Sequence, residues 1–223
     1  MKTDHPFVKT PLFLRRGLQA LALLALVAGV AGCSLIPPPV ADPTRYYVLS
    51  SRGPAETLAT GIGSGPTLGF VAVELPTYLR TTKSMLVRRS DHEIYFADYS
   101  RWAEPIDSGV GLIVRDGLLT SGRLGAVVSP PYTPGQPRAF DLRVRLIRCE
   151  GGRNADGGNV AIFIARYDLT PIDKSTDASI RGTFAATERP WDGTDFGQLA
   201  ALLSLAATEL ASEIASKLPE SLN

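Results

Sequence analysis

An uncharged run near the beginning of the chain, Gly17 to Ala31, constrains the fold more than any other feature. Four basic residues precede it: Lys2, Lys9, Arg15 and Arg16. A run of about 15 residues fits the apolar core of a secretory signal and is shorter than the roughly 20 residues that a membrane-spanning helix needs. Small residues, Ala31 and Gly32, end the segment as at a signal cleavage point. We therefore predict that residues 1–32 are a signal peptide and that the folded domain is built from residues beyond it.

The residue after the predicted cleavage point is Cys33, one of two cysteines in the chain. The order of small residues and cysteine resembles a bacterial lipobox, in which the thiol receives diacylglycerol and the freed amino group is acylated. Two or three acyl chains hold a protein on a membrane, because each buried methylene contributes about 0.8 kcal/mol. The alternative is an ordinary signal peptide, or a short anchor helix, with an incidental cysteine. We predict that Cys33 is lipidated.

The segment after the cysteine, residues 33–44, is expected to be a tether. It contains Pro37, Pro38, Pro39 and Pro43. At about 3.1 Å per residue, such a stiff spacer reaches up to ~30 Å from the lipid surface. In lipoproteins of this type an aspartate after the cysteine commonly signals retention at the inner membrane, and here the residue is Ser34. The resemblance implies the periplasmic face of the outer membrane, with the periplasmic face of the inner membrane as the alternative.

Residues 45–223 are long enough for one domain with a hydrophobic core of its own. The chain is 44% hydrophobic and 20% charged, with a formal net charge of +1. This composition gives no basic excess of the kind that nucleic-acid binding requires, so we expect no nucleic-acid partner. Only Cys149 remains besides Cys33, so no internal disulfide is possible and the core alone must stabilise an exported domain.

Runs of aromatic, β-branched or alternating apolar residues predict a series of strands. They are Arg45–Leu49, Thr67–Glu74, Met85–Arg89, Glu93–Asp98, Ala126–Ser129, Phe140–Ile147, Val160–Leu169 and Ile180–Thr187. The third and fourth are expected to form a hairpin, and Val160–Leu169, apolar on both faces, is expected in the centre of the sheet. Loops or turns are predicted at Gly53–Pro66, Pro130–Pro137 and Gly151–Gly158.

The strand that begins at Phe140 has the clearest charge pattern. Its outward positions are Asp141, Arg143 and Arg145, which alternate with apolar residues. This pattern predicts a half-buried strand with a charged outer face. Apolar residues continue at Ile147 and Cys149, and this slip of phase predicts a bulge. Arginines 143, 145 and 148 are interpreted as a solvated face, with lipid headgroups or acidic partners as the alternative.

Two helices are predicted. After Pro105, apolar residues recur at helical spacing as far as Leu118, although three glycines (109, 111 and 117) interrupt the run and predict close approach to the sheet. The last helix runs to Leu218 and is capped by Thr194 or Asp195. The predicted fold class is therefore α+β: a single domain with a mixed, mostly antiparallel sheet and two main helices packed on one face.

No group of residues predicts catalysis, a cofactor or a metal site. His92 lies in a predicted hairpin turn, where a general base would lack a nucleophile and an orienting partner. Cys149 is interpreted as a small buried hydrophobe, and the one histidine and one cysteine that follow Cys33 are too few ligands for a metal. The glycine-rich stretch Gly61–Thr67 has no lysine and precedes a strand, so it is interpreted as a linker rather than a phosphate loop. We predict that the protein is not an enzyme.

Several short motifs come one after another in a recognisable order. A lipobox and a proline spacer precede Arg45–Leu49, and Val71–Leu79 combines a strand with a proline-tyrosine-leucine turn. Arg101–Ile106, which contains a tryptophan, leads into the first helix, and Leu199–Leu218 closes the domain. Together these motifs resemble the PqiC-like family, the ABC-type transport auxiliary lipoprotein components that are partners of MCE-type lipid transporters. The resemblance covers nearly all of the chain after the signal peptide.

The resemblance implies a periplasmic lipoprotein that is anchored in the outer membrane. Such a protein acts as an auxiliary docking or binding component of an MCE/ABC-type system that transports lipid or a hydrophobic solute, and it contributes to envelope integrity. Its partners would be an MCE-type periplasmic protein, an inner-membrane ABC permease with its ATPase, and membrane lipid through acylated Cys33. A homo-oligomeric ring is expected, with a monomer that assembles on its partner as the alternative, and the contacts are expected near Tyr78 and at Tyr132 in the loop Pro130–Pro137. The alternatives are a structural envelope lipoprotein and a lipid-acting envelope hydrolase. Trp102 is expected to be a packing anchor.

Overall fold

The computed structural model describes residues 17, 21, 40–51, 65–173 and 179–219. The chain divides into two units, Met1–Asp42 and Pro43–Asn223. Every described core residue lies between Leu49 and Leu218, so the second unit has a hydrophobic core of its own. Cys33, the predicted signal peptide up to residue 32, most of the spacer and nearly all of the predicted loop from residue 53 to 66 lie outside the described residues.

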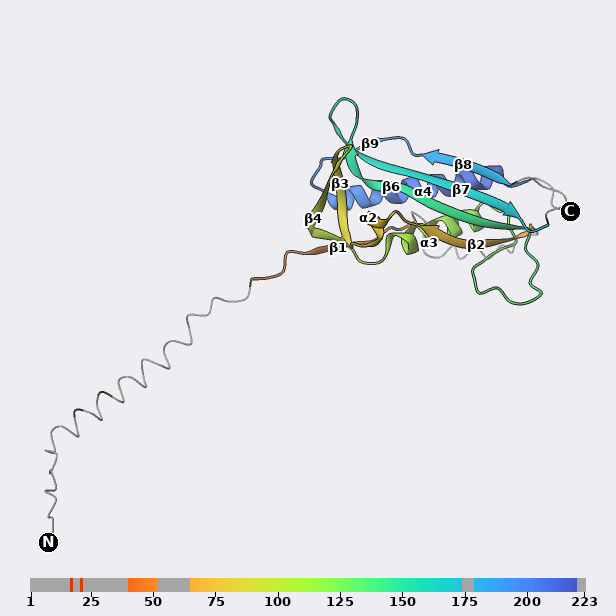
Figure 1. Cartoon of the computed structure of the whole chain (residues 1–223), viewed down its shortest axis with the longest axis horizontal. Coiled ribbons are helices and arrows are strands. Elements are labelled where there is room, and N and C mark those ends of the chain that lie inside the picture. The colour runs from red at the N-terminus through yellow and green to blue at the C-terminus, as the bar shows by residue number, and fades with distance from the viewer. Residues whose placement is uncertain (1–16, 18–20, 22–39, 52–64, 174–178, 220–223) are drawn as a thin grey trace, which may run out of the picture. The chain divides into compact units, whose positions relative to one another are not determined.

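In the described part of the chain, nine strands form one mixed sheet (Figure 1). They are β1 (Arg45–Tyr47), β2 (Thr67–Glu74), β3 (Ser84–Ser90), β4 (Glu93–Trp102), β5 (Ala126–Val128), β6 (Phe140–Arg153), β7 (Asn159–Pro171), β8 (Ile180–Ala185) and β9 (Arg189–Pro190). The order across the sheet is β1-β4-β3-β6-β2-β5, and β7 pairs with β6, β8 and β9. The hairpin predicted from β3 and β4 is present and antiparallel.

The two longest strands, β6 and β7, form an antiparallel hairpin that runs the length of the sheet. Their register extends from Phe140 opposite Pro171 to Arg153 opposite Asn159. The other edge of β6 pairs first with β2 and then with β3, both in parallel orientation. The far edge of β7 is divided in the same way between β8 and β9. The sheet therefore has two halves that share β6 and β7.

A bulge separates these halves, as the slip of phase in the sequence predicts. The β6–β7 register shifts between Leu146 and Arg148, so that Ile147 is the additional residue. Before the bulge, the even-numbered residues of β6 are buried and the odd-numbered ones are less buried or exposed. Beyond it, Cys149 pairs with the core residue Phe163, and Arg148 and Glu150 take the outer face. One extra residue changes which side chains face the core.

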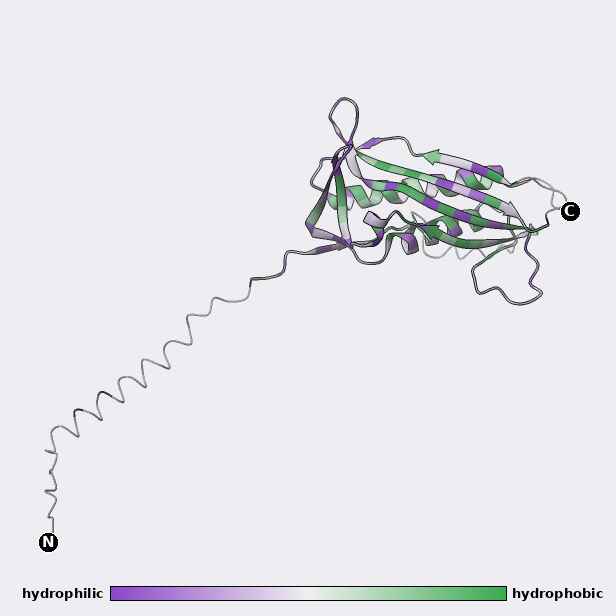
Figure 2. Cartoon of the chain, in the orientation of Figure 1, coloured by the Kyte–Doolittle hydropathy of each residue, from purple (hydrophilic) through white to green (hydrophobic). Residues whose placement is uncertain are grey.

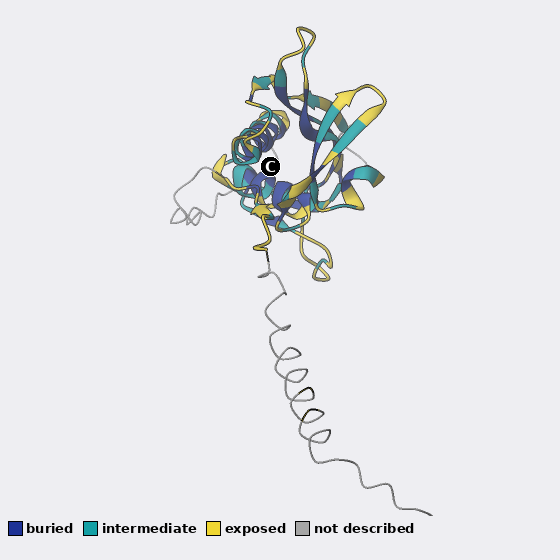
Figure 3. Ribbon diagram, turned by 90° about the vertical axis from the view of Figure 1, so that its left-hand side faces the viewer, coloured by how far each residue is buried: buried dark blue, intermediate teal, exposed yellow. Residues whose placement is uncertain are grey.

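The helices α3 (Ile106–Thr120) and α4 (Phe196–Lys217) contact each other and cover one face of the sheet, whereas α2 (Thr77–Arg80) is a single turn (Figures 1 and 3). Asp195 caps α4, since its Oδ1 accepts hydrogen bonds from the backbone N–H groups of Gly197 (2.8 Å) and Gln198 (3.1 Å). By length and composition alone α4 could cross a membrane. Its apolar stripe is buried against α3 and the sheet, which makes it the core helix of the domain.

The predicted α+β class is confirmed, with a mixed sheet and both main helices on one face. Two local predictions are corrected. Gly151 and Gly152 belong to β6 rather than to the turn, because their missing side chains make room for Trp191 and Ile162. A Cβ on Gly151 would lie 2.8 Å from the Trp191 ring, and one on Gly152 would lie 2.3 Å from Cδ1 of Ile162.

The second correction concerns the glycines of α3. Gly109 and Gly111 approach Leu49 and the β2 residue Phe70, but Gly117 faces the other helix rather than the sheet. A Cβ on Gly117 would lie 2.6 Å from the Cβ of Ala211 on α4, which is closer than side chains pack. The two helices therefore cross at this glycine. The expected packing role of Trp102 agrees with its position at the end of β4, where it is buried.

Candidate functional site

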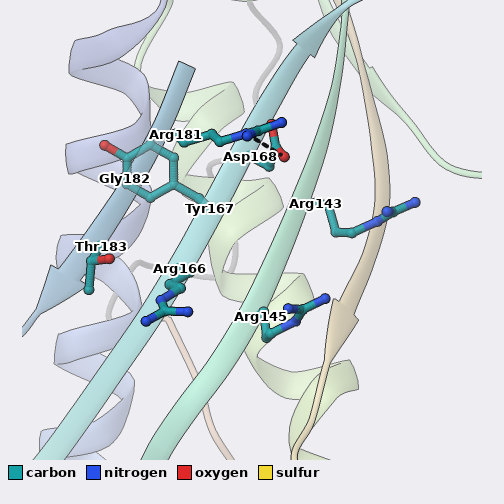
Figure 4. Close-up of a pocket in the computed structure, with 8 residues that line it drawn as sticks. All are labelled: Arg143, Arg145, Arg166, Tyr167, Asp168, Arg181, Gly182 and Thr183. Atoms are coloured by element: carbon teal, nitrogen blue, oxygen red, sulfur yellow. Dashed lines mark hydrogen bonds and ion pairs between the residues drawn. The ribbon is translucent and has the colours of Figure 1, made fainter. Parts of the chain in front are cut away.

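The face of the sheet opposite the helices carries charged residues that alternate with apolar ones along β6 and β7 (Figure 2), and β8 adds Arg181. In the half before the bulge they line an open hollow of about 370 Å³. Its lining residues are Arg143, Arg145, Arg166, Tyr167, Asp168, Arg181, Gly182 and Thr183 (Figure 4). We call this site the arginine hollow. Four guanidinium groups from three neighbouring strands make it a candidate binding surface for an anion.

Strand register explains how these residues come together. Arg143 on β6 lies opposite Asp168 on β7, which in turn lies opposite Arg181 on β8. In the next outward row, Arg145 lies opposite Arg166. Residues opposite each other on neighbouring strands share one face of the sheet, so all four arginines are presented to the same side.

Two carboxylates compensate part of this positive charge. Arg145 Nη2 lies 2.7 Å from Glu74 Oε2, and Arg143 Nε lies 3.5 Å from Oε1 of the same carboxylate. Arg181 Nε lies 3.2 Å from Asp168 Oδ2, and Arg166 makes no ion pair within the described ranges. The arginine side chains of these pairs are 57–76% exposed, and exposed pairs of this kind are weak. The hollow therefore keeps an excess of positive charge that a ligand can use.

Beyond the bulge, the same face of β6 carries a second charge cluster of a different kind. The Glu150 side chain is 0% exposed, and its Oε1 accepts hydrogen bonds from Arg88 Nε (2.6 Å) and Arg148 Nε (2.9 Å). The Arg88 guanidinium also lies 5.7 Å from the centre of the Tyr78 ring. We call these four residues the Glu150 cluster. It joins α2, β3 and β6, so it connects the elements of the sheet rather than facing solvent.

Tyr78 completes this cluster. Its hydroxyl donates a hydrogen bond to the backbone carbonyl of Ile147, at 3.1 Å. Burial, and then the negative charge of Glu150, raise the pKa of Tyr78 to about 12. The hydrogen bond to Glu150 raises the pKa of Arg88 as well. Tyr78 therefore stays neutral and Arg88 stays positively charged, so the charge of Arg88 continues to balance the buried carboxylate of Glu150.

The two tyrosines expected to contact partners both have neighbours inside the domain. Tyr78 belongs to the Glu150 cluster, and the ring of Tyr132 lies 3.9 Å from the guanidinium of Arg138. By contrast, Tyr46 and Tyr99 are 62% and 58% exposed. The sequence alone did not single out these two residues, because the pairing of β1 with β4, which places Tyr46 opposite Arg101, is not visible in a local pattern.

The remaining predicted residues take the places expected of them. His92 is exposed in the turn between β3 and β4. Cys149 is a buried free cysteine, and burial raises the pKa of its thiol. In the part of the chain that the structure describes, no three His, Cys, Asp or Glu side chains form a group that could hold a metal ion. Arg166 and Arg181 were not predicted as site residues, although the spacing of Arg166 and Asp168 within an apolar strand signals an outward charged face.

Comparison with known protein families identifies the family of this chain. A sequence profile described as ABC-type transport auxiliary lipoprotein component matches residues 47–215. The chain belongs to this family. The match covers the auxiliary lipoprotein domain from β1 to the last turns of α4, and it confirms the resemblance to the PqiC-like family that the motifs indicate. The family is one of auxiliary transport components and is not a known enzyme family.

Solved structures agree on the fold of this auxiliary lipoprotein. A crystal structure of an uncharacterized protein aligns with a TM-score of 0.59 at 19% identity, over 79% of this chain and 99% of that one. Protein XCC0632 from Xanthomonas campestris aligns with a TM-score of 0.58 at 20% identity, over 76% and 92% of the two chains. The PelC dodecamer from Paraburkholderia phytofirmans is a distant likeness, with a TM-score of 0.41 at 14% identity over 68% and 86%. No curated protein matches the chain.

Proposed function

We propose that this auxiliary lipoprotein is held at the periplasmic face of the outer membrane by acylated Cys33 and serves an MCE/ABC-type lipid or hydrophobic-solute transport system. The observation that carries the proposal is the family match over residues 47–215. A signal-like segment that ends at a cysteine adds a means of attachment. In this proposal residues 1–32 are removed, residues 33–44 are the tether, and residues 45–223 are the working domain.

The structure supports a tethered rather than a membrane-embedded domain. The unit Pro43–Asn223 has a complete core, and its apolar helix α4 is used within that core. Such a domain needs its lipid for position and not for folding. Ser34 in place of an aspartate supports sorting to the outer membrane. Loss of the anchor would leave a folded domain in the wrong place.

The partners we propose are an MCE-type periplasmic protein and an inner-membrane permease with its ATPase, which would supply the hydrolysis of ATP. The contribution of this chain would then be docking or binding, and through it a contribution to envelope integrity. We further propose that several copies form a ring around the partner, because a closed ring needs only one repeated interface. The exposed Tyr46 and Tyr99 support this arrangement, since tyrosines are enriched where protein surfaces meet.

Mass spectrometry and crosslinking in the native envelope test these proposals. The membrane-extracted protein should begin at an acylated Cys33, and Cys33→Ser should move the domain to the soluble fraction. Crosslinked wild-type protein should contain multiples of the chain together with an MCE-type protein. An unmodified Cys33 behind an uncleaved signal would refute the anchor. Monomers alone, with no such partner, would refute both the ring and the docking role.

A further inference from the structure

The arginine hollow contains more positive charge than its two carboxylates compensate. Four arginines share Glu74 and Asp168, which leaves an excess of two positive charges on one face of a chain whose formal net charge is only +1. Arg145 and Arg166 also lie directly opposite each other in the β6–β7 register. Like charges in this position destabilise a strand pair. A bound anion would remove that repulsion.

The donors in the hollow match one kind of anion. A guanidinium is planar, stays charged and presents paired N–H donors that fit the oxygens of a phosphate or carboxylate. Here such groups come from three neighbouring strands, and the hydroxyl of Thr183 adds a further donor (Figure 4). Strands in a sheet lie about 4.8 Å apart, so arginines on adjacent strands can contact the same group. A hollow of about 370 Å³ is large enough for a phosphate ester with its alcohol.

A second hollow of about 450 Å³ adjoins the first, and both are lined by Arg145 and Arg166. The second hollow adds an apolar wall of Leu75, Pro76 and Ile147. Glu74, which pairs with Arg145, also lines the second hollow, so a partly compensated positive charge borders apolar surface along the outer face of β6. This combination suits a molecule with a phosphate at one end and hydrocarbon at the other, and it offers more to that molecule than to a free inorganic anion.

We infer that the arginine hollow binds the phosphate of an anionic amphiphile, with the phospholipid headgroup in the first hollow and the beginning of its acyl chains against Leu75, Pro76 and Ile147. The inference rests on the proposed transport function for its biological setting and names the class of lipid that the domain contacts. Arg166 and Arg181 are the principal contacts, because Arg166 has no ion pair in the described part of the chain and Arg181 is the most exposed of the paired arginines. Zwitterionic lipids would bind more weakly, since their cationic group would meet the same arginines.

The test is a calorimetric titration of the unit Pro43–Asn223 with soluble short-chain phosphatidylglycerol. Parallel titrations use phosphatidylcholine of the same chain length and inorganic phosphate. The double variant Arg166→Ala/Arg181→Ala should lose affinity for phosphatidylglycerol by about a hundredfold, because one hydrogen bond to a charged group is worth about tenfold and two arginines are removed. The matched control Arg101→Ala/Arg153→Ala removes the same charge at exposed positions on β4 and β6 outside the hollow and should bind as the wild type does.

Each result decides a separate part of the inference. Equal losses in both double variants would show that only net charge matters and would overturn the site. Equal affinity for inorganic phosphate and for the short-chain lipid would overturn the apolar part and leave a phosphate site alone. Thermal unfolding of both variants checks that they fold. The variant Arg166→Lys/Arg181→Lys keeps the positive charges but loses the paired N–H donors of the guanidinium groups, so it should bind with intermediate affinity. Because the titration contains no partner protein, its failure would leave the crosslinking test of the proposed function unaffected.

Discussion

The two arginine clusters on β6 differ in burial, although they occupy the same face of the same strand. Arg143 and Arg145 precede the bulge and are more than half exposed, with ion pairs to a half-exposed Glu74. Arg148 lies beyond the bulge and contacts a Glu150 side chain that is 0% exposed. A buried carboxylate must be compensated for the domain to fold, whereas an exposed arginine is replaced by water at little cost. The same residue type therefore stabilises the fold on one side of Ile147 and is available for binding on the other.

The bulge is what makes this difference possible, so its removal should be the most damaging change. Deletion of Ile147 would place Arg148 directly after Leu146, so that β6 pairs with β7 without interruption. Arg148 and Glu150 would stay on the outer face, but the bend that the bulge gives β6 would be lost. We expect a larger loss of stability, measured as thermal unfolding by circular dichroism, than in any variant below. The strand β6 would no longer bend between its partners β2 and β3, and the Ile147 carbonyl that accepts the Tyr78 hydrogen bond would be gone. The control Ile147→Ala keeps the residue count and should remain folded. A deletion variant with a native-like transition would show that the two halves of the sheet do not depend on the bulge.

A smaller but still severe loss is expected inside the Glu150 cluster. Arg88→Ala removes one of the two partners of a fully buried carboxylate, and breaking a buried pair from one side typically costs about 3–5 kcal/mol. Since Arg148 remains, we expect a loss of about 3 kcal/mol in the free energy of unfolding, measured by urea denaturation of Pro43–Asn223. The neighbouring Arg89→Ala removes an exposed pair with Glu93 and a contact of the guanidinium with the Tyr95 ring, and it should cost about 1 kcal/mol or less. Similar losses in both variants would contradict the contrast between buried and exposed arginines.

Tyr78 gives the same cluster a pH dependence. At neutral pH, Tyr78→Phe should lose about 1 kcal/mol, because the hydrogen bond to the Ile147 carbonyl is removed. The folded pKa of about 12 lies above the ordinary value of 10, so the contribution of the neutral hydroxyl is present below pH 10 and is lost as the pH rises to 12. In urea titrations over this range, the stability of the wild type should fall more steeply than that of Tyr78→Phe. Parallel curves would mean that the hydroxyl is free to ionise in the folded state.

The arginine hollow should tolerate substitution best. Arg166→Ala should change the free energy of unfolding by no more than about 0.5 kcal/mol. We expect the change to favour the variant, since Arg166 lies opposite Arg145 and the repulsion between them is removed. Urea denaturation at low and high salt measures this contribution, because salt screens the repulsion in the wild type. A loss of about 2 kcal/mol or more, the size typical of a buried contact, would place Arg166 with the structural cluster and end the distinction between the two halves.

Much of the fold could be predicted from the sequence because local patterns determine it. The alternation from Phe140 indicated the outer face of β6, the slip at Ile147 indicated the bulge, and the spacing of apolar residues indicated both main helices. Gly151 and Gly152 were misassigned to a turn because the large side chains that fill the space beside them, Trp191 and Ile162, come from other parts of the chain.

The candidate sites were less predictable than the fold. The row of Arg143 and Arg145 is visible in the sequence, but Arg166 and Arg181 join it only through the register of β7 with both of its neighbours. The Glu150 cluster depends on a contact between residues 62 positions apart, Arg88 and Glu150, which no local pattern specifies. The charge pattern therefore indicated which residues of β6 lie on its outer face. The pairing between strands distant in sequence determined whether those residues form an exposed hollow or a buried cluster.

The contact between α3 and α4 has a consequence for how the sequence of this domain can diverge. Since a Cβ at position 117 would lie 2.6 Å from the Cβ of Ala211, there is room for one methyl group at this crossing and not for two. An alanine at position 117 would be accepted only with a glycine at 211, or with helices that have moved apart. These two positions, 94 residues apart in the chain, therefore cannot drift independently. Among related sequences these two positions should change together, so that glycine occupies position 117 in some sequences and position 211 in others.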